Sequence, residues 1–362
     1  MLRQYDIGFD PGNSETAAVV SDPDGNQSAL AFPSYISRGD TESLVRFRAM
    51  VGGGQATHPR EVLQADEHVL TYPAGGGSEY YVGELAMSQG KGASSARGDI
   101  NRYWSFLALA LLLTIAGLLI PDREFAVRVV TGLPIETFSE PNRRKVRSCL
   151  EGDHHYLLDG EQRRAIVYVE KVIMEGAGAM IACGDSRPVR QAVIDVGGRT
   201  TDLYTTQGQT PLIPLCRGTA LGVELAGDLL NATVQTQCDR LLTPLEVRSV
   251  LRASVGSGQF PPIYAHGQEV NSIDLHRWTE EALRSVGRDI AVYAGQTWAN
   301  DELGGVATDM ARVVLVGGGA YYTHPEIVRL IPYVTIAQQP ELANALGYAA
   351  LARHLRQRRE ER

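Results

Sequence analysis

The chain has 362 residues, of which 44% are hydrophobic and 21% are charged, and its formal net charge is −8. This length favours two domains of an ordinary globular protein, and the acidic balance excludes a molecule that coats nucleic acid over its whole surface. The four scattered cysteines form no CxxC pair and no apolar leader opens the chain, so we expect a reduced, cytoplasmic protein.

The first segment, residues 3–32, predicts three strands because short apolar runs alternate with turn sequences. In the first of these turns Asp10 ends a strand, and Gly12 and Asn13 reverse the chain. Residues 33 to about 100 are richer in Gly, Ser and Ala, which predicts a small subdomain inserted into the first domain. Around residues 38–60 a pair of flexible loops is the alternative.

An apolar run of seventeen residues, Trp104–Ile120, allows two interpretations. A membrane-spanning helix needs about 20 apolar residues. This run is shorter, contains Ser105, Thr114 and Gly117, and stops at a proline. We therefore expect a buried helix at the centre of an α/β domain and no insertion into a membrane.

Beyond the apolar run, the pattern predicts a strand over Phe125–Pro134 and a helix from near Pro141 whose basic residues form a solvated face. A later strand ends at Met174, and Glu175 begins a helix of small residues. An acid at this junction either favours the helix dipole or serves as a catalytic group, since α/β sheets expose such groups at the carboxyl ends of their strands.

The stretch AVIDVGGRTTDL, residues 192–203, has the features of a phosphate-binding β-hairpin. Its first strand ends in Asp195, which is placed to hold a hydrated divalent cation, and the Gly197–Gly198 turn brings backbone N–H groups toward an anion. The Asp10 turn has the same layout 185 residues earlier, close to half the chain length. The pair indicates an internal duplication in which both hairpins grip one polyphosphate and its metal.

The last third of the chain contains three recognisable features. A helix is predicted with Thr243 as N-cap and Pro244 at its first position. A buried strand within Ala311–Gly319 ends in three glycines, which let a ligand ring lie against the backbone or simply turn the chain into a helix. The final helix has a basic end, Arg353–Arg362, that we expect to fray in solvent.

Together these features resemble the actin/Hsp70/sugar-kinase ATPase superfamily: in chain order, a phosphate loop at Asp10, a strand-end Glu175, a second phosphate loop at Asp195 and a VGGGA turn at Val316–Ala320. Within the superfamily the chain is similar to bacterial and archaeal actin-like proteins of the plasmid-segregation (ParM/StbA) type. The local cues are SEYYVGELA, VVTGLP, VIMEGAGA and ANALGYAAL, which begin at residues 78, 129, 172 and 343.

The resemblance implies an α/β fold of two duplicated ribonuclease H-like domains with a nucleotide cleft between them. Domain I would cover residues 1–190, with the inserted subdomain at about 33–100, and would be completed by the C-terminal helix 341–362. Domain II would cover residues 191–340, with an inserted helical subdomain at about 235–305.

The resemblance also implies three catalytic acids. Asp10 and Asp195 would hold Mg²⁺ through its water shell, and Glu175 would orient or deprotonate the attacking water. Hydrolysis of this kind is mainly positioning and charge neutralisation, so two hard oxygen ligands and one carboxylate base suit it.

A second group of residues would contact the nucleotide. The β- and γ-phosphates would lie against Gly12, Asn13, Ser14, Gly197, Gly198 and Thr200, and the adenosine against Gly317, Gly318, Gly319 and Ala320, with Gly222 and Glu224 on the ribose side. Three residues depart from the family pattern: Pro11 stiffens the first loop, Glu15 puts an acid beside the phosphates, and Arg199 either binds phosphate or faces solvent.

The sequence contains no Walker A, GxGxxG, HExxH or GxSxG motif, which leaves a nucleotide-driven switch as the best-supported chemistry. We expect an ATPase, using ATP or GTP, that polymerises into filaments and moves or positions DNA, such as a plasmid, or other cargo through an adaptor protein. Two alternatives stay open: a small-molecule (sugar-type) kinase of the same superfamily, and a non-polymerising scaffold that binds ATP.

Overall fold

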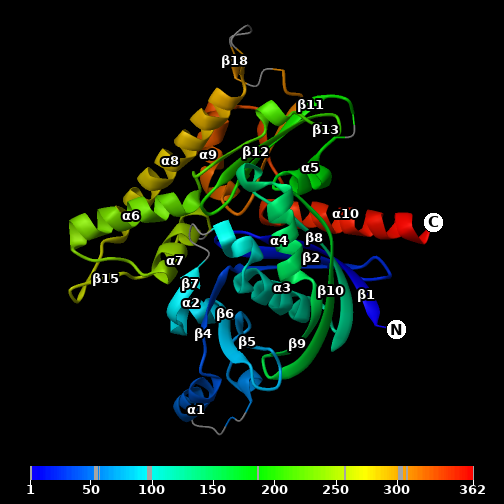
Figure 1. The fold of residues 1–362 in the computed structure, drawn as a ribbon. Helices are drawn as coiled ribbons and strands as arrows, with labels where there is room; N and C mark the ends of the chain where they lie inside the picture. The colour runs from blue at the N-terminus through cyan, green and yellow to red at the C-terminus, as the bar shows by residue number, and fades with distance from the viewer. Residues whose placement is uncertain are drawn as a thin grey trace. The chain divides into compact units, whose positions relative to one another are not determined.

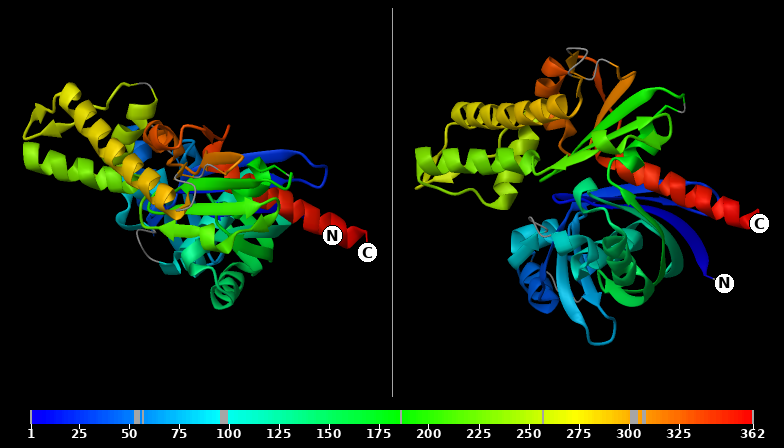
Figure 2. Two further views of the ribbon diagram at one scale, coloured as in Figure 1. Left: turned by 90° about the horizontal axis from the view of Figure 1, so that it is seen from above. Right: turned by 45° about the horizontal axis from the view of Figure 1, so that its top comes forward.

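The computed structural model describes residues 2–52, 56, 58–95, 100–185, 187–256, 258–300, 305–306 and 309–361. The chain forms two compact α/β units: unit 1 comprises Met1–Ala182 and Asn344–Arg362, and unit 2 comprises Cys183–Ala343 (Figure 1, Figure 2). The predicted α/β class is therefore confirmed. Residues 53–55, 57, 96–99, 257 and 301–304 of the two expected insertions, and residue 362 of the expected last helix, lie outside the described residues.

Unit 1 is built on one large mixed sheet. Its described strands are, in spatial order, β3 (Gln27–Pro33), β2 (Glu15–Ser21), β1 (Arg3–Pro11), β8 (Glu124–Leu133), β10 (Glu161–Met174), β9 (Gly152–Leu158), β5 (Glu67–Tyr72), β6 (Ser78–Gly83), β4 (Tyr35–Arg38) and β7 (Lys91–Ser95). The three strands predicted within residues 3–32 are present as β1, β2 and β3. β1 pairs with β2 antiparallel and with β8 parallel, so it lies inside the sheet and is largely buried.

The segment expected as an inserted subdomain continues this sheet. β5 pairs with β9 at Leu70↔Leu158, and β6, β4 and β7 follow outward from β5. Residues 41–51, for which loops were the alternative, form α1 (Thr41–Val51), whose first turn is capped by the Asp40 side chain. A second helix, α2 (Glu84–Gln89), follows β6.

The apolar run forms α3 (Phe106–Leu119), in which Ala108–Gly117 are all buried. It packs on one face of the sheet in a core that includes Phe9 of β1 and Val129 of β8, with α4 (Glu140–Leu150) beside it (Figure 1). The expected buried helix is confirmed, and no helix in the described ranges is long and apolar enough to cross a membrane.

The opposite face of the sheet is covered by α10 (Ala343–Glu360). Strand side chains alternate between faces, so Val130 points away from α3 and packs with Tyr348 and Ala352 of α10. Gly8 of β1 permits this close approach, because a Cβ there would lie 1.9 Å from the carbonyl oxygen of Ala345.

Two arginines near the end of α10 form ion pairs with the sheet. Arg356 donates through Nε to buried Asp6 at 2.9 Å, and Arg359 pairs with Glu170. The expectation that Arg353–Arg362 frays is therefore wrong over its described part, where the helix continues to Glu360. Sequence composition could not reveal the two acids, which lie far away along the chain.

Unit 2 has a smaller sheet with helices packed against it. In spatial order its described strands are β13 (Thr210–Pro211), β12 (Thr201–Gln207), β11 (Arg190–Val196), β19 (Arg312–Val316) and β20 (Val334–Ile336), with β14 (Arg217–Thr219) also beside β12. The helices are α6 (Val223–Cys238), α7 (Pro244–Val255), α8 (Ser272–Thr297) and α9 (Ala320–Leu330). Two short pairs lie outside the sheet: β15 (Tyr264–Ala265) with β16 (Gln268–Glu269), and β17 (Ala299–Asn300) with β18 (Gly305–Val306).

The start of α7 confirms the predicted cap. The Thr243 hydroxyl accepts from the N–H of Glu246 at 3.2 Å, and the Glu246 carboxylate accepts from the N–H of Thr243 at 2.8 Å. The short helical turns of the described chain are η1 (Pro59–Glu61), η2 (Ile100–Trp104), η3 (Ile135–Thr137), η4 (Ile213–Leu215) and η5 (Pro340–Leu342).

The two units repeat one strand arrangement. In the β1–β2 hairpin Asp6 pairs with Ser21, and in the β11–β12 hairpin Gln191 pairs with Thr206, so both partners are shifted by 185 residues. Each first strand also has a parallel neighbour, β8 in unit 1 and β19 in unit 2. A shared register along two whole hairpins supports the internal duplication inferred from the two acidic turns.

The Asp6–Arg356 pair gives a stability prediction. Burial raises the pKa of Asp6, and the neighbouring Arg356 opposes that rise. We expect Arg356→Gln to lower the free energy of unfolding by about 2–3 kcal/mol at pH 7, because it leaves a buried carboxylate without its cation. Because the pKa of Asp6 is raised, we expect the loss to be smaller at pH 4.5 than at pH 7, since a proton taken up by Asp6 in the folded state removes the charge that Arg356 balances.

Chemical denaturation at both pH values measures this effect. Arg358→Gln, an exposed arginine on the same turn, is the matched control, and Asp6→Asn combined with Arg356→Gln should recover most of the loss. Equal destabilisation by the two arginine variants at pH 7 would contradict the assignment.

Candidate functional site

The loop between β1 and β2, residues 12–14, is held from one side by Ser34. The N–H of Ser34 donates to the carbonyl oxygen of Ser14 at 2.9 Å. The hydroxyl of Ser34 donates to the carbonyl oxygen of Gly12 at 2.7 Å. In a trans peptide the C=O of one residue and the N–H of the next point in opposite directions. The N–H of Asn13 therefore points away from Ser34, whereas the N–H of Gly12 donates to the Asp10 carbonyl at 3.0 Å within the turn.

The loop between β11 and β12, residues 197–200, is held in the same way by the first turn of α6. The N–H groups of Val223 and Glu224 donate to the carbonyl oxygens of Gly197 and Gly198 at 3.1 and 2.7 Å. The N–H groups of Gly198 and Arg199 consequently point away from α6. Each loop thus presents backbone donors on the side opposite its anchor, which is the arrangement of an anion-binding nest.

The two acids occupy equivalent places in their hairpins. Asp10 pairs in register with Ala17, and Asp195 pairs with Asp202. Asp195 is buried at the end of β11, and its Oδ1 lies so close to Gly317 that a Cβ there would be 2.5 Å away. Both carboxylates therefore stand at the base of a loop that presents N–H groups.

The side chain of Arg199 is bonded within unit 2. Its Nε donates to Glu224 at 2.9 Å, and its Nη2 lies 3.9 Å from Asp228 on the next turn of α6. The sequence left phosphate and solvent as the alternatives for Arg199, and the structure shows a third arrangement. An acid on the adjoining helix was not foreseen, because the two residues are 25 positions apart.

Gly222, expected on the ribose side, has a packing role. It is the N-cap of α6, and a Cβ there would lie 2.4 Å from the carbonyl oxygen of Gly198 and 2.5 Å from the nitrogen of Arg199. Real Cβ atoms essentially never approach other atoms so closely. The absence of a side chain at Gly222 is what lets α6 reach the loop.

The glycines after β19 have a similar explanation. Gly317 has φ +85° and its Cβ would lie 2.3 Å from the carbonyl oxygen of Val196, while the N–H of Gly319 donates to that oxygen at 2.8 Å. Ala320, fully buried, then begins α9. The Gly317–Ala320 turn therefore lies directly against the end of β11, one residue beyond Asp195.

Glu175 follows the last residue of β10 and is buried. Its N–H donates to the carbonyl of Leu133 at 2.8 Å, which extends the pairing with β8 by one residue. Helix α5 (Ala177–Cys183) begins two residues later, and the Asn344 side chain of α10 accepts from the N–H groups of Gly176 and Ala179 at 3.2 and 3.0 Å. Both the strand and α10 therefore fix the main chain at Glu175.

The Glu175 side chain belongs to a buried hydrogen-bonded chain. Its Oε1 accepts from the Tyr103 hydroxyl at 2.7 Å, and Arg102 donates to the same hydroxyl. Arg102 also donates through Nη1 to the carbonyl oxygen of Pro11 at 3.0 Å. Both residues lie in η2 (Ile100–Trp104). This chain connects Glu175 to the last residue of β1, just before the Gly12 loop.

Within each unit the structure thus brings expected site residues together. In unit 1 Pro11, which directly precedes the loop at residues 12–14, is joined to Glu175 through Arg102 and Tyr103. In unit 2 the loop at residues 197–200 contacts Gly222 and Glu224, and Val196, which directly precedes the loop, contacts the turn at Gly317–Ala320. That the loops of both units bind one nucleotide stays a prediction.

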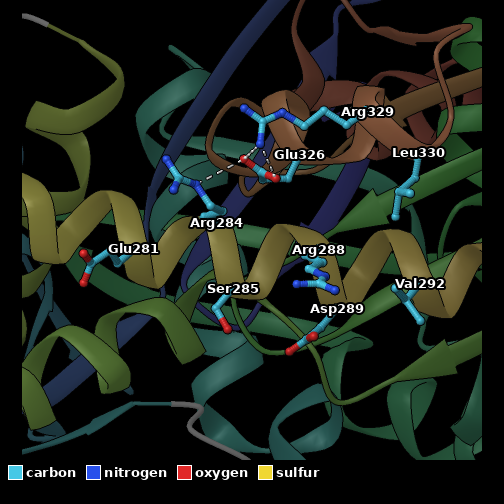
Figure 3. Close-up of a pocket in the computed structure, with 9 residues that line it drawn as sticks. All are labelled: Glu281, Arg284, Ser285, Arg288, Asp289, Val292, Glu326, Arg329 and Leu330. Carbon is cyan, nitrogen blue, oxygen red and sulfur yellow. Dashed lines mark hydrogen bonds and ion pairs between the residues drawn. The ribbon is translucent and has the colours of Figure 1, made fainter.

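A separate groove lies between α8 and α9 in unit 2 (Figure 3). Glu326 of α9 stands between two arginines, with Arg284 Nε at 3.6 Å and Arg329 Nη1 at 3.0 Å from its Oε1. Gly287 of α8 allows the two helices to approach, because a Cβ there would lie 2.9 Å from the Cβ of Glu326. None of the residues expected to contact nucleotide lines this groove.

Comparison with protein families decides the identity of the fold. Residues 8–178 match the N-terminal domain of actin-like proteins, and residues 193–328 match the C-terminal domain of the archaeal MreB-like actin homologues. The chain belongs to the actin-like proteins. The predicted two-domain actin-like fold is therefore confirmed. A comparison with curated proteins gave no match.

Solved structures that resemble this actin-like protein extend over nearly its whole length. The archaeal actin homologue Ta0583 is 21% identical, with a TM-score of 0.72 over 98% of this chain and 100% of its own. Ta0583 in complex with ADP gives 19% identity and a TM-score of 0.71 over 96% and 99% of the two chains. ParM from a 15-stranded filament of Clostridium botulinum is 20% identical, with a TM-score of 0.75 over 98% and 100%.

Four residues that build the site gave no signal in the sequence. Ser34 holds the first loop, Arg102 and Tyr103 contact Pro11 and Glu175, and Asn344 caps α5. Asn344 lies in the ANALGYAAL cue, so its segment was noticed but its contact was not. Each of these side chains acts on a residue distant in sequence, and a single sequence carries no pattern for such pairs.

The packing of Gly222 predicts a specific defect. We expect Gly222→Ala to destabilise the actin-like protein by about 2 kcal/mol, since the added methyl group collides with rigid backbone of the 197–200 loop. Gly267→Asn is the control, because that turn position in unit 2 has open space and a φ of +82°, which Asn accepts. Denaturant unfolding curves measure both, and equal midpoints would contradict the proposed collision.

Proposed function

We propose that this actin-like protein binds ATP with Mg²⁺, hydrolyses it and assembles into filaments. The observation that supports the proposal best is the repeated hairpin: the same register, an acid at the same strand position and a loop that presents its N–H groups outward. Two such loops suit one polyphosphate, which carries several negative charges along its length. The ADP bound to the related Ta0583 is consistent with this ligand class.

The residues fit a hydrated magnesium ion. Asp10 and Asp195 provide hard carboxylate oxygens at the bases of the two loops, and Mg²⁺ prefers such ligands while it keeps several waters. When bound, the ion would neutralise charge on the β- and γ-phosphates. The N–H groups of Asn13, Gly198 and Arg199 would contact phosphate oxygens, because these are the amides that the loop anchors turn outward.

Glu175 is the residue that we propose as the general base. Its carboxylate is buried, which would strengthen its interaction with the attacking water, and its main chain is fixed from two sides. The Tyr103 hydroxyl holds one carboxylate oxygen. Glu175 would accept a proton from the attacking water, while the two loops bear the charge that develops on the phosphates.

Assembly follows from the properties of a nucleotide-driven switch. Contacts to the γ-phosphate would favour one arrangement of the two units, and its loss would favour another, so subunit association would depend on nucleotide state. Head-to-tail contacts through one repeated surface make open filaments. A filament in the cytoplasm would position DNA, such as a plasmid, or other cargo through an adaptor protein.

Sedimentation tests the assembly directly. We expect the protein to pellet at high speed with ATP and Mg²⁺ and to pellet far less with ADP, because the γ-phosphate contacts favour the polymer. GTP in place of ATP tests the base preference, and removal of Mg²⁺ with a chelator should abolish the pellet. Phosphate release without a pellet under any nucleotide would refute assembly, and phosphate transfer to an added sugar would establish the kinase instead.

A substitution of the proposed base separates binding from chemistry. We expect Glu175→Gln to slow phosphate release by at least about 100-fold while nucleotide affinity changes less than about threefold, since a general base acts in the transition state. Its filaments should persist longer with ATP than those of the wild type.

Phosphate release and fluorescent-nucleotide titration measure the two effects of Glu175→Gln. Glu42→Gln, an exposed glutamate on α1, serves as the control. Parallel losses of affinity and rate in Glu175→Gln would show that Glu175 is not the base.

A further inference from the structure

The arrangement of Arg102, Tyr103 and Glu175 is unusual for a protein interior, because it buries a cation and an acid with a hydroxyl between them. Their exposed fractions are 6%, 2% and 7%. The Tyr103 hydroxyl donates to Glu175 Oε1 at 2.7 Å and accepts from Arg102 Nη2. Burying such groups is costly unless their hydrogen bonds are made.

The hydroxyl sets the orientation of the carboxylate. A tyrosine O–H that donates to one carboxylate oxygen fixes the torsion of the side chain and favours the charged form of the acid. Because the same hydroxyl also accepts from a guanidinium, its proton is a stronger donor than that of an isolated tyrosine. Tyr103 thus holds the Glu175 carboxylate in one orientation.

The guanidinium sets the position of that hydroxyl relative to the first loop. Arg102 stacks on the Tyr103 ring, with Cζ 4.1 Å from the ring centroid, and its Nη1 donates to the Pro11 carbonyl oxygen at 3.0 Å. Pro11 is the last residue of β1, and Gly12 of the loop follows it. One planar group therefore contacts both the strand that carries the loop and the residue that holds the acid.

We propose that Arg102 and Tyr103 are positioning residues that fix the Glu175 carboxylate relative to the β1–β2 loop for hydrolysis. The inference rests on the proposed function, since it concerns the reaction in which Glu175 acts as base. Neither residue needs to contact nucleotide in this role. The general base would be held in place through two side chains from η2 rather than by its own strand alone.

Two variants test this role, with a matched control. Tyr103→Phe deletes the hydroxyl, and Arg102→Lys keeps the cation but not the fork that reaches two acceptors. Tyr156→Phe is the control: Tyr156 in β9 is also fully buried in unit 1, and in the described structure its hydroxyl has no hydrogen-bond partner. Thermal unfolding of all three variants reports whether the fold is kept.

The readout is phosphate release across pH, at protein concentrations below those at which filaments pellet. We expect Tyr103→Phe to lower kcat by about 10- to 100-fold and to change KM for ATP less than about threefold. A displaced general base slows the chemical step but leaves the contacts that bind the nucleotide in place. Without the donor the carboxylate protonates more readily, so the acidic limb of the kcat profile should move to higher pH. Arg102→Lys should show the same changes to a smaller extent, and Tyr156→Phe should match the wild type.

Each outcome bears on the inference. If Tyr103→Phe keeps the wild-type kcat and pH profile while Glu175→Gln is inactive, the positioning role is refuted and the proposed function stands. If Tyr103→Phe does not fold, Arg102→Lys becomes the test. A folded Arg102→Lys variant with the wild-type kcat and pH profile would refute the positioning role. If the wild type releases no phosphate, the proposed function fails and the inference fails with it.

Discussion

The feature on which both candidate phosphate loops depend is the bonding of their carbonyl oxygens to protein donors. A short loop between two strands has as many C=O groups as N–H groups, and a carbonyl oxygen turned toward an anion repels it. Here the carbonyl oxygens of Gly12 and Ser14 are bonded to Ser34, and those of Gly197 and Gly198 to the start of α6. The duplicated hairpins therefore meet the same requirement with different donors: a side chain and an N–H of one residue in unit 1, and a helix N-terminus in unit 2.

A second constraint is the close packing of α10 in unit 1. A Cβ on Gly347 would lie 1.8 Å from the carbonyl oxygen of Gly178, and a Cβ on Gly132 would lie 2.0 Å from the Tyr348 hydroxyl and 3.3 Å from Cγ of Glu175. Three of the sequence cues that resembled the ParM type, VVTGLP, VIMEGAGA and ANALGYAAL, supply these glycines and Tyr348. Their shared physical role is to let β8, α5 and α10 converge around Glu175.

Sequence reasoning succeeded where the chemistry is local. Asp10 and Asp195 were recognised because each is followed within three residues by glycine, and the strands beside them have β-branched or apolar runs. It failed where a contact joins distant segments. The Arg199–Glu224 pair, the Asp6–Arg356 pair and the Tyr103–Glu175 hydrogen bond span 25, 350 and 72 positions, and no spacing rule connects such residues.

The glycines after β19 lie between these two cases, because the sequence showed their pattern but not the contact that explains it. Their pattern was visible, and a ligand face was one of two interpretations for it. The structure adds a reason that needs no ligand, since Gly317 and Gly319 pack on Val196 at the end of β11. An adenosine bound at this turn would therefore lie on glycines that the fold already requires.

The central claim is that the loops of both units bind one nucleotide, and a crystal structure of the protein with a non-hydrolysable ATP analogue and Mg²⁺ tests it most directly. The account predicts that the N–H of Asn13 and the N–H groups of Gly198 and Arg199 contact the same triphosphate, with Asp10 and Asp195 on the waters of one magnesium ion. A nucleotide bound to one loop alone, or bound elsewhere on either unit, would contradict it.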